Sequence, residues 1–319
     1  MSEILAPCGA MESLTAAVNA GADAVYLGEE YFSARKNADN FTAEQLCDAV
    51  RFCHYSGVKV YVTLNTLVFD REIPLLAKAI ENCAKADVDA FIVQDMGVAR
   101  LARQIVPELP LHASTQMTVN SPEGAIMAKE LGFTRVVLGR ELSLAQIKAI
   151  TESCDIETEL FVHGALCVCI SGQCYMSSVL GGRSGNRGLC AQPCRLDFTS
   201  GDRHNVLSLK DLSLTEKLPE LAKAGITSFK IEGRMKQAPY AAGVVSYYRK
   251  YIDQFLEHKK QKNLSKSDMQ DILDLGNRCG FTDGYYHKQN GADMVTFVKP
   301  SYAKTNEALQ NEIIDRYVN

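Results

Sequence analysis

The stretch KVYVTLNTLVFDREIPLLAKAIENCAKADVDAFIVQ, residues 59–94, contains the repeating unit of the chain. Its two ends, residues 59–65 and 89–94, are short runs rich in Val, Ile, Leu and aromatic residues, as expected of buried strands. Between them, residues 71–86 form an amphipathic stretch that is typical of a helix. A strand, a helix and a second strand in this order predict two parallel strands that are covered by a helix.

The same unit recurs on both sides of this stretch. The predicted strands are residues 4–7, 23–28, 59–65, 89–94, 111–114, 135–139, 157–162 and 228–231, and a further apolar run lies at 206–209. Eight such steps over roughly 250 residues predict an α/β fold of the (β/α)₈ TIM-barrel type. An open doubly wound sheet is the alternative, although no G-x-G-x-x-G turn follows the first strand.

The pattern divides the 319 residues unevenly. Residues 1–262 are predicted to form the TIM-barrel-like domain, with a cysteine-rich insertion at 163–203 after the seventh strand. Residues 263–319 are predicted to form a C-terminal appendage with a helix near 266–279 and a short hairpin or bulged strands after it. The first residues resemble no signal peptide, and no apolar run is long enough to span a membrane, so we expect a cytoplasmic protein.

The insertion holds five of the eleven cysteines. Cys167 and Cys174 precede a glycine-rich loop, Cys190 and Cys194 follow it, and Cys169 is the expected spare thiol. A polar loop gains little from core burial, so a centre bound by four thiolates would supply folding energy there. An iron-sulfur cluster is the favoured interpretation, and structural zinc and free buried cysteines are the alternatives.

Polar residues follow the predicted strands, and in a barrel such residues line the active face. His163 is interpreted as a cluster ligand, a proton shuttle, a hydrogen-bond partner or a structural residue. Asn65, Gln116, Glu141 and Asp95 are either site residues or helix caps. Several cations are expected to form a pocket for a carboxylate or phosphate, namely Arg140, Arg183, Arg187, Lys210, Lys230, Arg234 and Lys236.

Charge is distributed unevenly along the chain. Residues 161–262 hold fifteen Lys and Arg against eight Asp and Glu, whereas the remainder holds nineteen against thirty. A positive third on an acidic body could steer a polyanion to one face, although chance clustering gives the same pattern. Tyrosines that could stack on a base, or pack in the core or rim, are Tyr31, Tyr175, Tyr240 and Tyr247.

Several motifs carry a resemblance to a known family. The pattern Glu159-x-Phe161-x-x-Gly-Ala-Leu-Cys167, together with Gly172-x-Cys174-x-Met-Ser, resembles the signature of peptidase family U32. The segments LAPCG, GADAVYLG, VYVTLNTLV, VVLGREL, SLKDL and FKIEGRMK extend the resemblance to about residue 251. GGRSGNRGLCAQPCR and GNRCGFTDGYY are most similar to the branch named for 23S rRNA cytidine hydroxylation.

This resemblance implies a [4Fe-4S] enzyme that hydroxylates an RNA base without oxygen and uses prephenate as co-substrate. Its four cysteines match Cys167, Cys174, Cys190 and Cys194. We expect 23S rRNA cytidine as the target; tRNA uridine hydroxylation, a collagenase-like protease and a non-catalytic RNA-binding protein with a structural cluster are alternatives. No H-E-x-x-H or G-x-S-x-G motif supports the protease.

The remaining site residues are predicted from the strand-end positions and the family resemblance together. His163, Glu232 and Arg234 are the candidates for proton transfer and anion positioning. Arg140, Arg183, Arg187, Lys210 and Arg234 are the candidates for binding prephenate. Members of the rRNA branch extend further than this chain, so we also expect that a partner protein could supply the missing RNA-docking parts.

Overall fold

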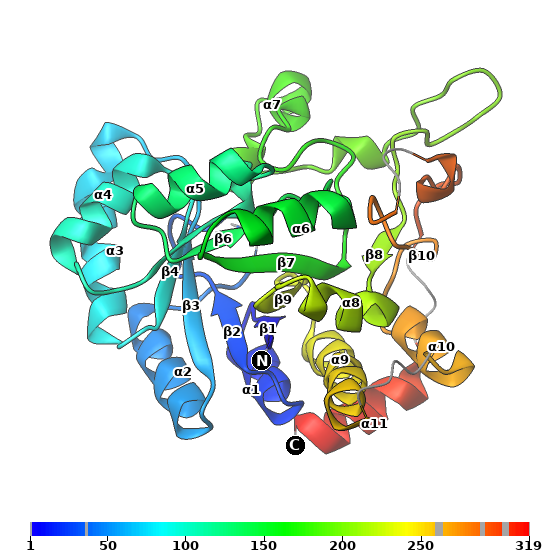
Figure 1. Cartoon of the computed structure of the whole chain (residues 1–319), viewed down its shortest axis with the longest axis horizontal. Helices are drawn as coiled ribbons and strands as arrows, with labels where there is room; N and C mark the ends of the chain where they lie inside the picture. Colours follow the sequence, from blue (N-terminus) through cyan, green and yellow to red (C-terminus); the bar gives the residue numbers. More distant parts are fainter. Residues whose placement is uncertain (1, 36–37, 259–263, 288–290, 302–305, 319) are drawn as a thin grey trace.

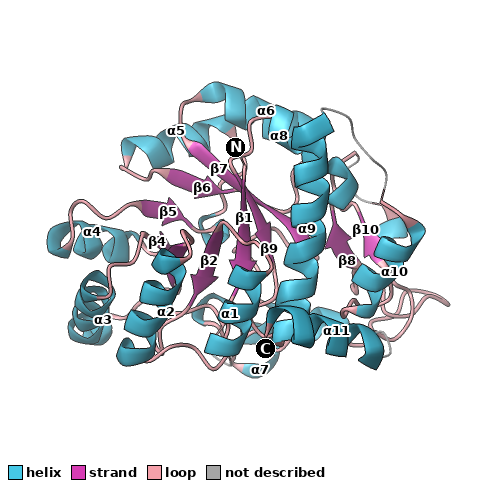
Figure 2. Ribbon diagram, turned by 90° about the horizontal axis from the view of Figure 1, so that it is seen from below, coloured by secondary structure: helices cyan, strands magenta, loops and turns pink. Residues whose placement is uncertain are grey.

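The computed structural model describes residues 2–35, 38–258, 264–287, 291–301 and 306–318. Eight parallel strands form a closed barrel, because β1 pairs with both β2 and β9, and β9 pairs in turn with β7. The (β/α)₈ prediction is therefore confirmed (Figures 1 and 2). The strands are β1 Glu3–Pro7, β2 Ala24–Leu27, β3 Lys59–Leu64, β4 Ala90–Val93, β5 Leu111–Ala113, β6 Arg135–Val137, β7 Glu157–Gly164 and β9 Ser228–Ile231.

Helices surround the barrel, as the view in Figure 2 shows. Their apolar sides meet the outward faces of the strands, where residues such as Val60, Val62 and Phe91 are fully buried. This layer between strands and helices is the main hydrophobic core. The helices are α1 Met11–Asn19, α2 Ala43–Tyr55, α3 Ile73–Lys85, α4 Met96–Ile105, α5 Pro122–Glu130, α6 Leu144–Ser153, α8 Leu218–Lys223 and α9 Ala238–His258.

Local sequence explains where these helices begin. Thr42 caps α2, because its hydroxyl accepts a hydrogen bond from the backbone N–H of Gln45. The side-chain oxygen of Gln45 in turn accepts a hydrogen bond from the backbone N–H of Thr42. Asp95 caps α4 through the N–H groups of Gly97 and Val98. Each cap satisfies backbone donors that have no partner inside the helix. Asp95, for which the sequence allowed either a role in the site or a helix cap, is therefore a helix cap.

The barrel interior contains charged residues at its amino-terminal end. Arg135 of β6 contacts Glu3 of β1 and the carboxylates of Glu157 and Glu159 of β7. Lys230 of β9 binds Glu159 with an N···O distance of 2.6 Å. Because four of the strands contribute to this network, it links the strands on either side of the point where the barrel closes.

The further apolar run at Val206–Leu209 does not form a strand. The strand of this region is instead β8, Asp211–Ser213, which pairs antiparallel with the end of β7 at His163 and Gly164. β7 is longer than its neighbours in the barrel, so its end is available for this pairing. Leu209 is buried in a small separate cluster with Leu166 and Met294, which accounts for the apolar run.

The described C-terminal residues pack against the barrel and the region around β8. β10, Phe281–Thr282, pairs parallel with β8, and Val295 forms an isolated bridge with Leu209. Both segments thus pair with the region around β8 instead of with each other. Two helices complete this region, α10 Lys266–Asp274 and α11 Glu307–Tyr317, and α11 packs on α1 and α9. None of the helices in the described ranges is long and apolar enough to cross a membrane.

Candidate functional site

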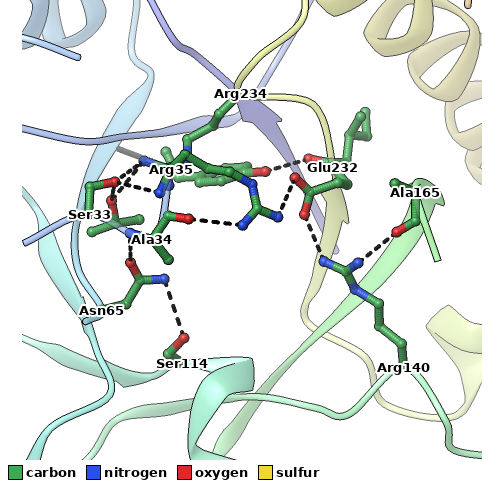
Figure 3. Close-up of polar contacts among 12 residues, drawn as sticks. Ser33, Ala34, Arg35, Asn65, Ser114, Arg140, Ala165, Glu232 and Arg234 are labelled. Carbon is green, nitrogen blue, oxygen red and sulfur yellow. Dashed lines mark hydrogen bonds and ion pairs between the residues drawn. The ribbon is translucent and has the colours of Figure 1, made fainter. Parts of the chain in front are cut away.

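A carboxylate between two arginines lies at the carboxyl end of the barrel (Figure 3). Glu232, directly after β9, accepts hydrogen bonds from Arg35 at 3.0 Å and from Arg140 at 2.7 Å. Burial alone would raise the pKa of Glu232, but the two guanidinium groups outweigh it and lower the pKa to about 2. Glu232 is therefore ionised at neutral pH.

Arg140 is held from three sides. Besides Glu232, it donates a hydrogen bond of 2.7 Å to the carbonyl of Ala165 at the start of the insertion. Its guanidinium also lies 3.8 Å from the ring centre of Phe161, a residue of β7. This arrangement fixes the orientation of Arg140 while leaving further N–H groups of its planar fork for a ligand.

Arg234 lies deeper in the mouth and is 3% exposed. Its Nη1 donates hydrogen bonds to Ser33 at 2.6 Å and to Thr63 at 2.9 Å, as Figure 3 shows for Ser33. Burial and the charge of Arg35 lower its pKa to about 10, so the group remains positive at neutral pH. A Cβ on Gly28 would lie 2.7 Å from this Nη1, so only glycine leaves room for the guanidinium here.

Asn65 connects two loops of the mouth instead of capping a helix. Its Oδ1 accepts a hydrogen bond of 2.9 Å from the N–H of Ala34, and its Nδ2 lies 3.5 Å from the hydroxyl of Ser114. Loops that follow β2, β3 and β5 are thereby joined around one space (Figure 3). The mouth thus combines three guanidinium groups, one carboxylate and several neutral polar side chains.

The cysteine-rich insertion is attached to this same face. Glu141 accepts hydrogen bonds from the N–H and the hydroxyl of Ser171, and the Ser171 carbonyl accepts one from Thr118. A Cβ on Gly172 would lie 2.3 Å from the carbonyl oxygen of Gln116, so the insertion approaches the loop after β5 closely. Glu141 therefore serves to attach the insertion. Helix α7, Met176–Gly181, projects beyond the barrel from this end (Figure 1).

The four predicted ligand cysteines lie in this insertion and are half-buried or exposed. Burial raises the pKa of the Cys194 thiol; the charge of Arg195 opposes this effect, and the thiols of Cys167, Cys190 and Cys174 add to it. The N–H of Gln192 donates to the sulfur of Cys190 at 3.3 Å, and the hydroxyl of Ser177 donates to it at 3.8 Å. Donors of this kind stabilise a thiolate.

The thiols do not form a ready-made coordination site. No group of three or more His, Cys, Asp or Glu residues is placed to hold a metal ion in the parts of the chain that are described. The donor set is nevertheless chemically suited to a tetrathiolate centre, since the four sulfurs gather on one insertion. Such a centre would draw the thiols together as it binds. Burial raises the pKa of Cys169, the expected spare thiol, and the neighbouring Cys174 adds to this effect.

The insertion lies beside the arginine cluster. Arg195 donates hydrogen bonds to the carbonyls of Leu166 and Leu209. These bonds hold the two ends of the insertion together. Arg140, which binds Glu232, also donates a hydrogen bond to the carbonyl of Ala165, two residues before Cys167. A group held by the thiols would therefore adjoin the mouth of the barrel.

His163 is not part of this mouth. A bulge between Phe161 and His163 in the pairing of β7 with β9 interrupts the alternation of side chains along β7. The imidazole packs against Tyr248 of α9, where Nδ1 lies 3.2 Å from the phenol oxygen, and against Phe281. Burial lowers its pKa to about 3, with the charge of Lys236 adding to the effect. His163 is thus a neutral, packed side chain.

Of the five cations predicted to bind prephenate, Arg140 and Arg234 belong to the mouth cluster and the other three do not. Arg183 bonds to the carbonyl of Leu189 within the insertion, and Arg187 binds Glu72 at the start of α3. Lys210 lies just before β8, where its N–H donates to Met294. The structure thus places these three cations in the insertion and its exit.

Sequence reasoning did not select Arg35, Ser33 and Thr63. Arg35 follows β2 and Thr63 lies near the end of β3, so the barrel rule for strand ends could have identified both.

Among the tyrosines considered for base stacking, Tyr31 and Tyr175 are exposed at 47% and 56%. Tyr240 is buried, and Tyr247 is partly buried with its hydroxyl bonded to Asp271.

Comparisons with known proteins agree with these features. The model of the family described as Peptidase family U32 matches residues 9–296. The chain is 42% identical over 81% of its length to a 23S rRNA 5-hydroxycytidine synthase of Escherichia coli, of which it covers 40%. It is 38% identical over 86% of its length to a tRNA hydroxylation protein of Bacillus subtilis, covering 69% of that protein. A protein of Porphyromonas gingivalis named collagenase is 35% identical, with 89% and 73% covered.

Proposed function

Because this chain belongs to peptidase family U32, we propose that it takes part in hydroxylating a base of bacterial RNA, most directly a cytidine of 23S rRNA. The observation that carries the proposal is the similarity to relatives named for rRNA and tRNA hydroxylation. The chain spans 40% of the length of the first of these relatives and 69% of the second. A tRNA uridine is the alternative target.

Four thiolates are proposed to hold the cofactor, a [4Fe-4S] cluster on Cys167, Cys174, Cys190 and Cys194. Such a cluster would supply one-electron redox chemistry in a reaction that does not use oxygen. This proposal is supported by the location of the four cysteines on one insertion, by the hydrogen bond from Arg140 to Ala165 two residues before Cys167, and by the hydrogen bonds donated to Cys190.

The arginines of the mouth are proposed to bind an anionic co-substrate, prephenate. Arg35 and Arg140 each present a planar fork of N–H donors, of which Glu232 occupies only some. A carboxylate can therefore join the pair without displacing Glu232, and Arg234 adds a buried positive charge. Glu232 binds both guanidinium groups and so fixes their orientation relative to each other. Its ionised state makes it a positioning group rather than a proton donor.

The target base must leave its stack before it can reach this mouth, because chemistry on a base edge requires access from the side. Single-stranded or unfolded RNA is therefore the proposed form of the substrate. The exposed Tyr31 lies in the loop after β2 and Tyr175 follows Cys174, so both are placed to contact such a strand.

A protease is the second candidate, because one relative is named collagenase. The geometry gives little support to it. In the described mouth, the hydroxyls of Ser33 and Thr63 bond to Arg234, and the hydroxyl of Ser114 lies beside Asn65. His163 bonds to Tyr248 instead of to a hydroxyl of the mouth. A nucleophile activated by an adjacent base is not assembled from these groups.

Mass spectrometry of nucleosides tests the proposal. RNA from a strain that lacks the gene should lose one hydroxylated nucleoside, and the intact gene should restore it. A Cys174→Ser gene should not restore it, which separates catalysis from simple RNA binding. If every hydroxylated nucleoside stays at the wild-type level while cluster-free protein cleaves a collagen peptide, the protease is correct and the hydroxylase is not.

A further inference from the structure

An exposed aromatic ring lies at the rim of the barrel mouth, in the loop between β3 and α3. Phe69 is 48% exposed. The guanidinium of Arg187 lies 4.5 Å from the centre of its ring and that of Arg71 lies 4.6 Å from it. Phe69 is thus an exposed aromatic ring with two guanidinium groups against it.

The two arginines differ in how firmly they are held. Arg187 donates hydrogen bonds to the carbonyl of Leu67 at 2.5 Å and to the carboxylate of Glu72 at 2.7 and 3.0 Å. The same carboxylate accepts the backbone N–H of Phe69 at 2.8 Å. The ring and Arg187 are therefore fixed to one another, whereas Arg71 is an exposed side chain.

A pocket of about 330 Å³ adjoins the ring between the first turns of α3 and α4. Apolar side chains such as Val68, Leu76 and Val98 contribute to its lining. Asp70, Arg100 and Gln104 also line it and are exposed, so they offer both hydrogen-bond donors and acceptors. This volume lies within the range of sites that hold small planar molecules, and a nucleobase is such a molecule.

We propose that Phe69 and this pocket bind a base of single-stranded RNA next to the nucleotide that enters the mouth. This inference rests on the proposed function and adds to it a specific contact outside the thiols and the Glu232 cluster. An aromatic ring for the base and arginines for the backbone phosphates are the combination found in single-strand binding sites.

Binding requires only a small rearrangement. The base stacks on the ring in the place of Arg71, whose exposed contact with the ring is weak and readily exchanged. Arg71 then turns to a phosphate, while Arg187 keeps the ring in position. Because Asn186 and Arg187 of the insertion contact Leu67 in this loop, the bound strand would lie alongside the cysteine insertion.

Fluorescence anisotropy with the full-length, anaerobically purified chain tests the inference. The probes are a labelled single-stranded RNA of about ten nucleotides and an abasic strand of equal length, which keeps the phosphates but has no bases. Phe69→Leu should weaken binding of the RNA about tenfold and leave the abasic strand unaffected, because only stacking is lost. Tyr55→Leu is the control, since Tyr55 is 93% exposed at the far end of α2 and should change neither affinity.

Two further measurements keep the inference separate from folding and from the proposed function. Circular dichroism checks that Phe69→Leu is folded, and photo-crosslinking of RNA that contains 5-iodocytidine to the unaltered protein should label Phe69. Equal RNA affinity of Phe69→Leu and wild type, or crosslinks elsewhere only, overturns the inference even if the chain hydroxylates RNA. Weaker binding by Phe69→Leu in a chain that hydroxylates no RNA supports this site while the proposed function fails. Absence of RNA binding by wild type overturns both.

Discussion

Glu232 shows how one residue's surroundings limit its chemistry. A carboxylate that hydrogen-bonds to Arg35 and Arg140 is charged at all physiological pH values, because its pKa is lowered to about 2. It therefore has little capacity to accept a proton during a reaction. What it can do is hold two arginines at a fixed spacing, which is the property that a site for a dicarboxylate needs.

Replacement of Glu232 by Gln should lower the free energy of unfolding at pH 7 by roughly 3 kcal/mol, since it removes a charge that the partly exposed guanidinium of Arg35 and the more buried one of Arg140 require. The folded pKa lies below the unfolded one, so this stabilisation is fully present above about pH 4.5 and is lost as the pH falls toward 2. Urea unfolding of both proteins at pH 7 and near pH 3 measures the difference.

Asp48→Asn provides the control for this experiment. Asp48 pairs with Arg51 on the exposed face of α2, where an ion pair contributes about 0.5 kcal/mol or less. Its unfolding midpoint should match that of wild type at both pH values. A Glu232→Gln protein that is as stable as wild type at pH 7 would show that the arginines do not depend on this carboxylate.

At the scale of elements, the cysteine insertion joins several loops of the barrel into one structure. Ser171 is held by Glu141, and Arg187 is held by Glu72, so the insertion is attached to the loops after β6 and β3. The four candidate thiols of the insertion are only half-buried or exposed. A bound centre would thus organise a segment whose ends are already fixed.

Single replacement of Cys167, Cys174, Cys190 or Cys194 by Ser should abolish cluster binding, because each removes one of four thiolates. Anaerobically purified wild type should be brown and contain about four irons and four sulfides per chain. Cys47→Ser and Cys154→Ser are the matched controls, since both thiols lie in or beside helices away from the insertion, and their iron content should equal that of wild type. Colourless wild-type protein with stoichiometric zinc would contradict the prediction.

The elements that the sequence predicted well are those with a strong and local signal. All eight barrel strands coincide with predicted runs, although β1 begins one residue earlier and β7 ends two residues later than predicted. Strands buried on both sides are rich in Val, Ile and Leu, which makes them recognisable. Val206–Leu209 has the same composition but is a turn region, because Leu209 is buried by Met294, which is far along the chain. A contact between residues so far apart in the chain cannot be predicted from the local sequence pattern.

The site was predictable to the extent that strand ends determine it. Arg140, Glu232 and Arg234 were selected by that rule and do meet in the mouth. His163 was selected by the same rule, but the bulge in the pairing of β7 with β9 and the packing of Tyr248 remove it from the mouth. A bulge depends on the register between two strands, which a single sequence does not reveal.

At the scale of the whole molecule, a buried charge network connects the strands at the closure of the barrel. Arg135 of β6 contacts carboxylates of β1 and β7, and Lys230 of β9 contacts Glu159 of β7. The side chains of Arg135 and Lys230 are no more than 5% exposed. Removal of one partner from such a network leaves buried charges without compensation.

Arg135→Met should therefore lower the free energy of unfolding by about 3 to 5 kcal/mol, since the carboxylates of Glu3 and Glu159 lose a guanidinium that water cannot replace. Chemical denaturation followed by circular dichroism measures this loss. Arg249→Met is the comparison, because Arg249 pairs with partly exposed Asp23 and Asp253 at the surface and should cost about 1 kcal/mol or less. Similar losses in the two variants would show that the interior network contributes no more than a surface pair.

The pairing of Gly164 with Leu212 means that the chain leaves the barrel at the end of β7 and returns beside the same point. Residues 165–210 are thus an excursion whose two ends already touch, and the register of the barrel strands does not depend on its length. Such an excursion can be lengthened, shortened or exchanged during evolution without altering the scaffold. The same geometry makes it a unit that protein engineers can transplant onto another barrel, because closing the gap that it leaves requires only a short turn.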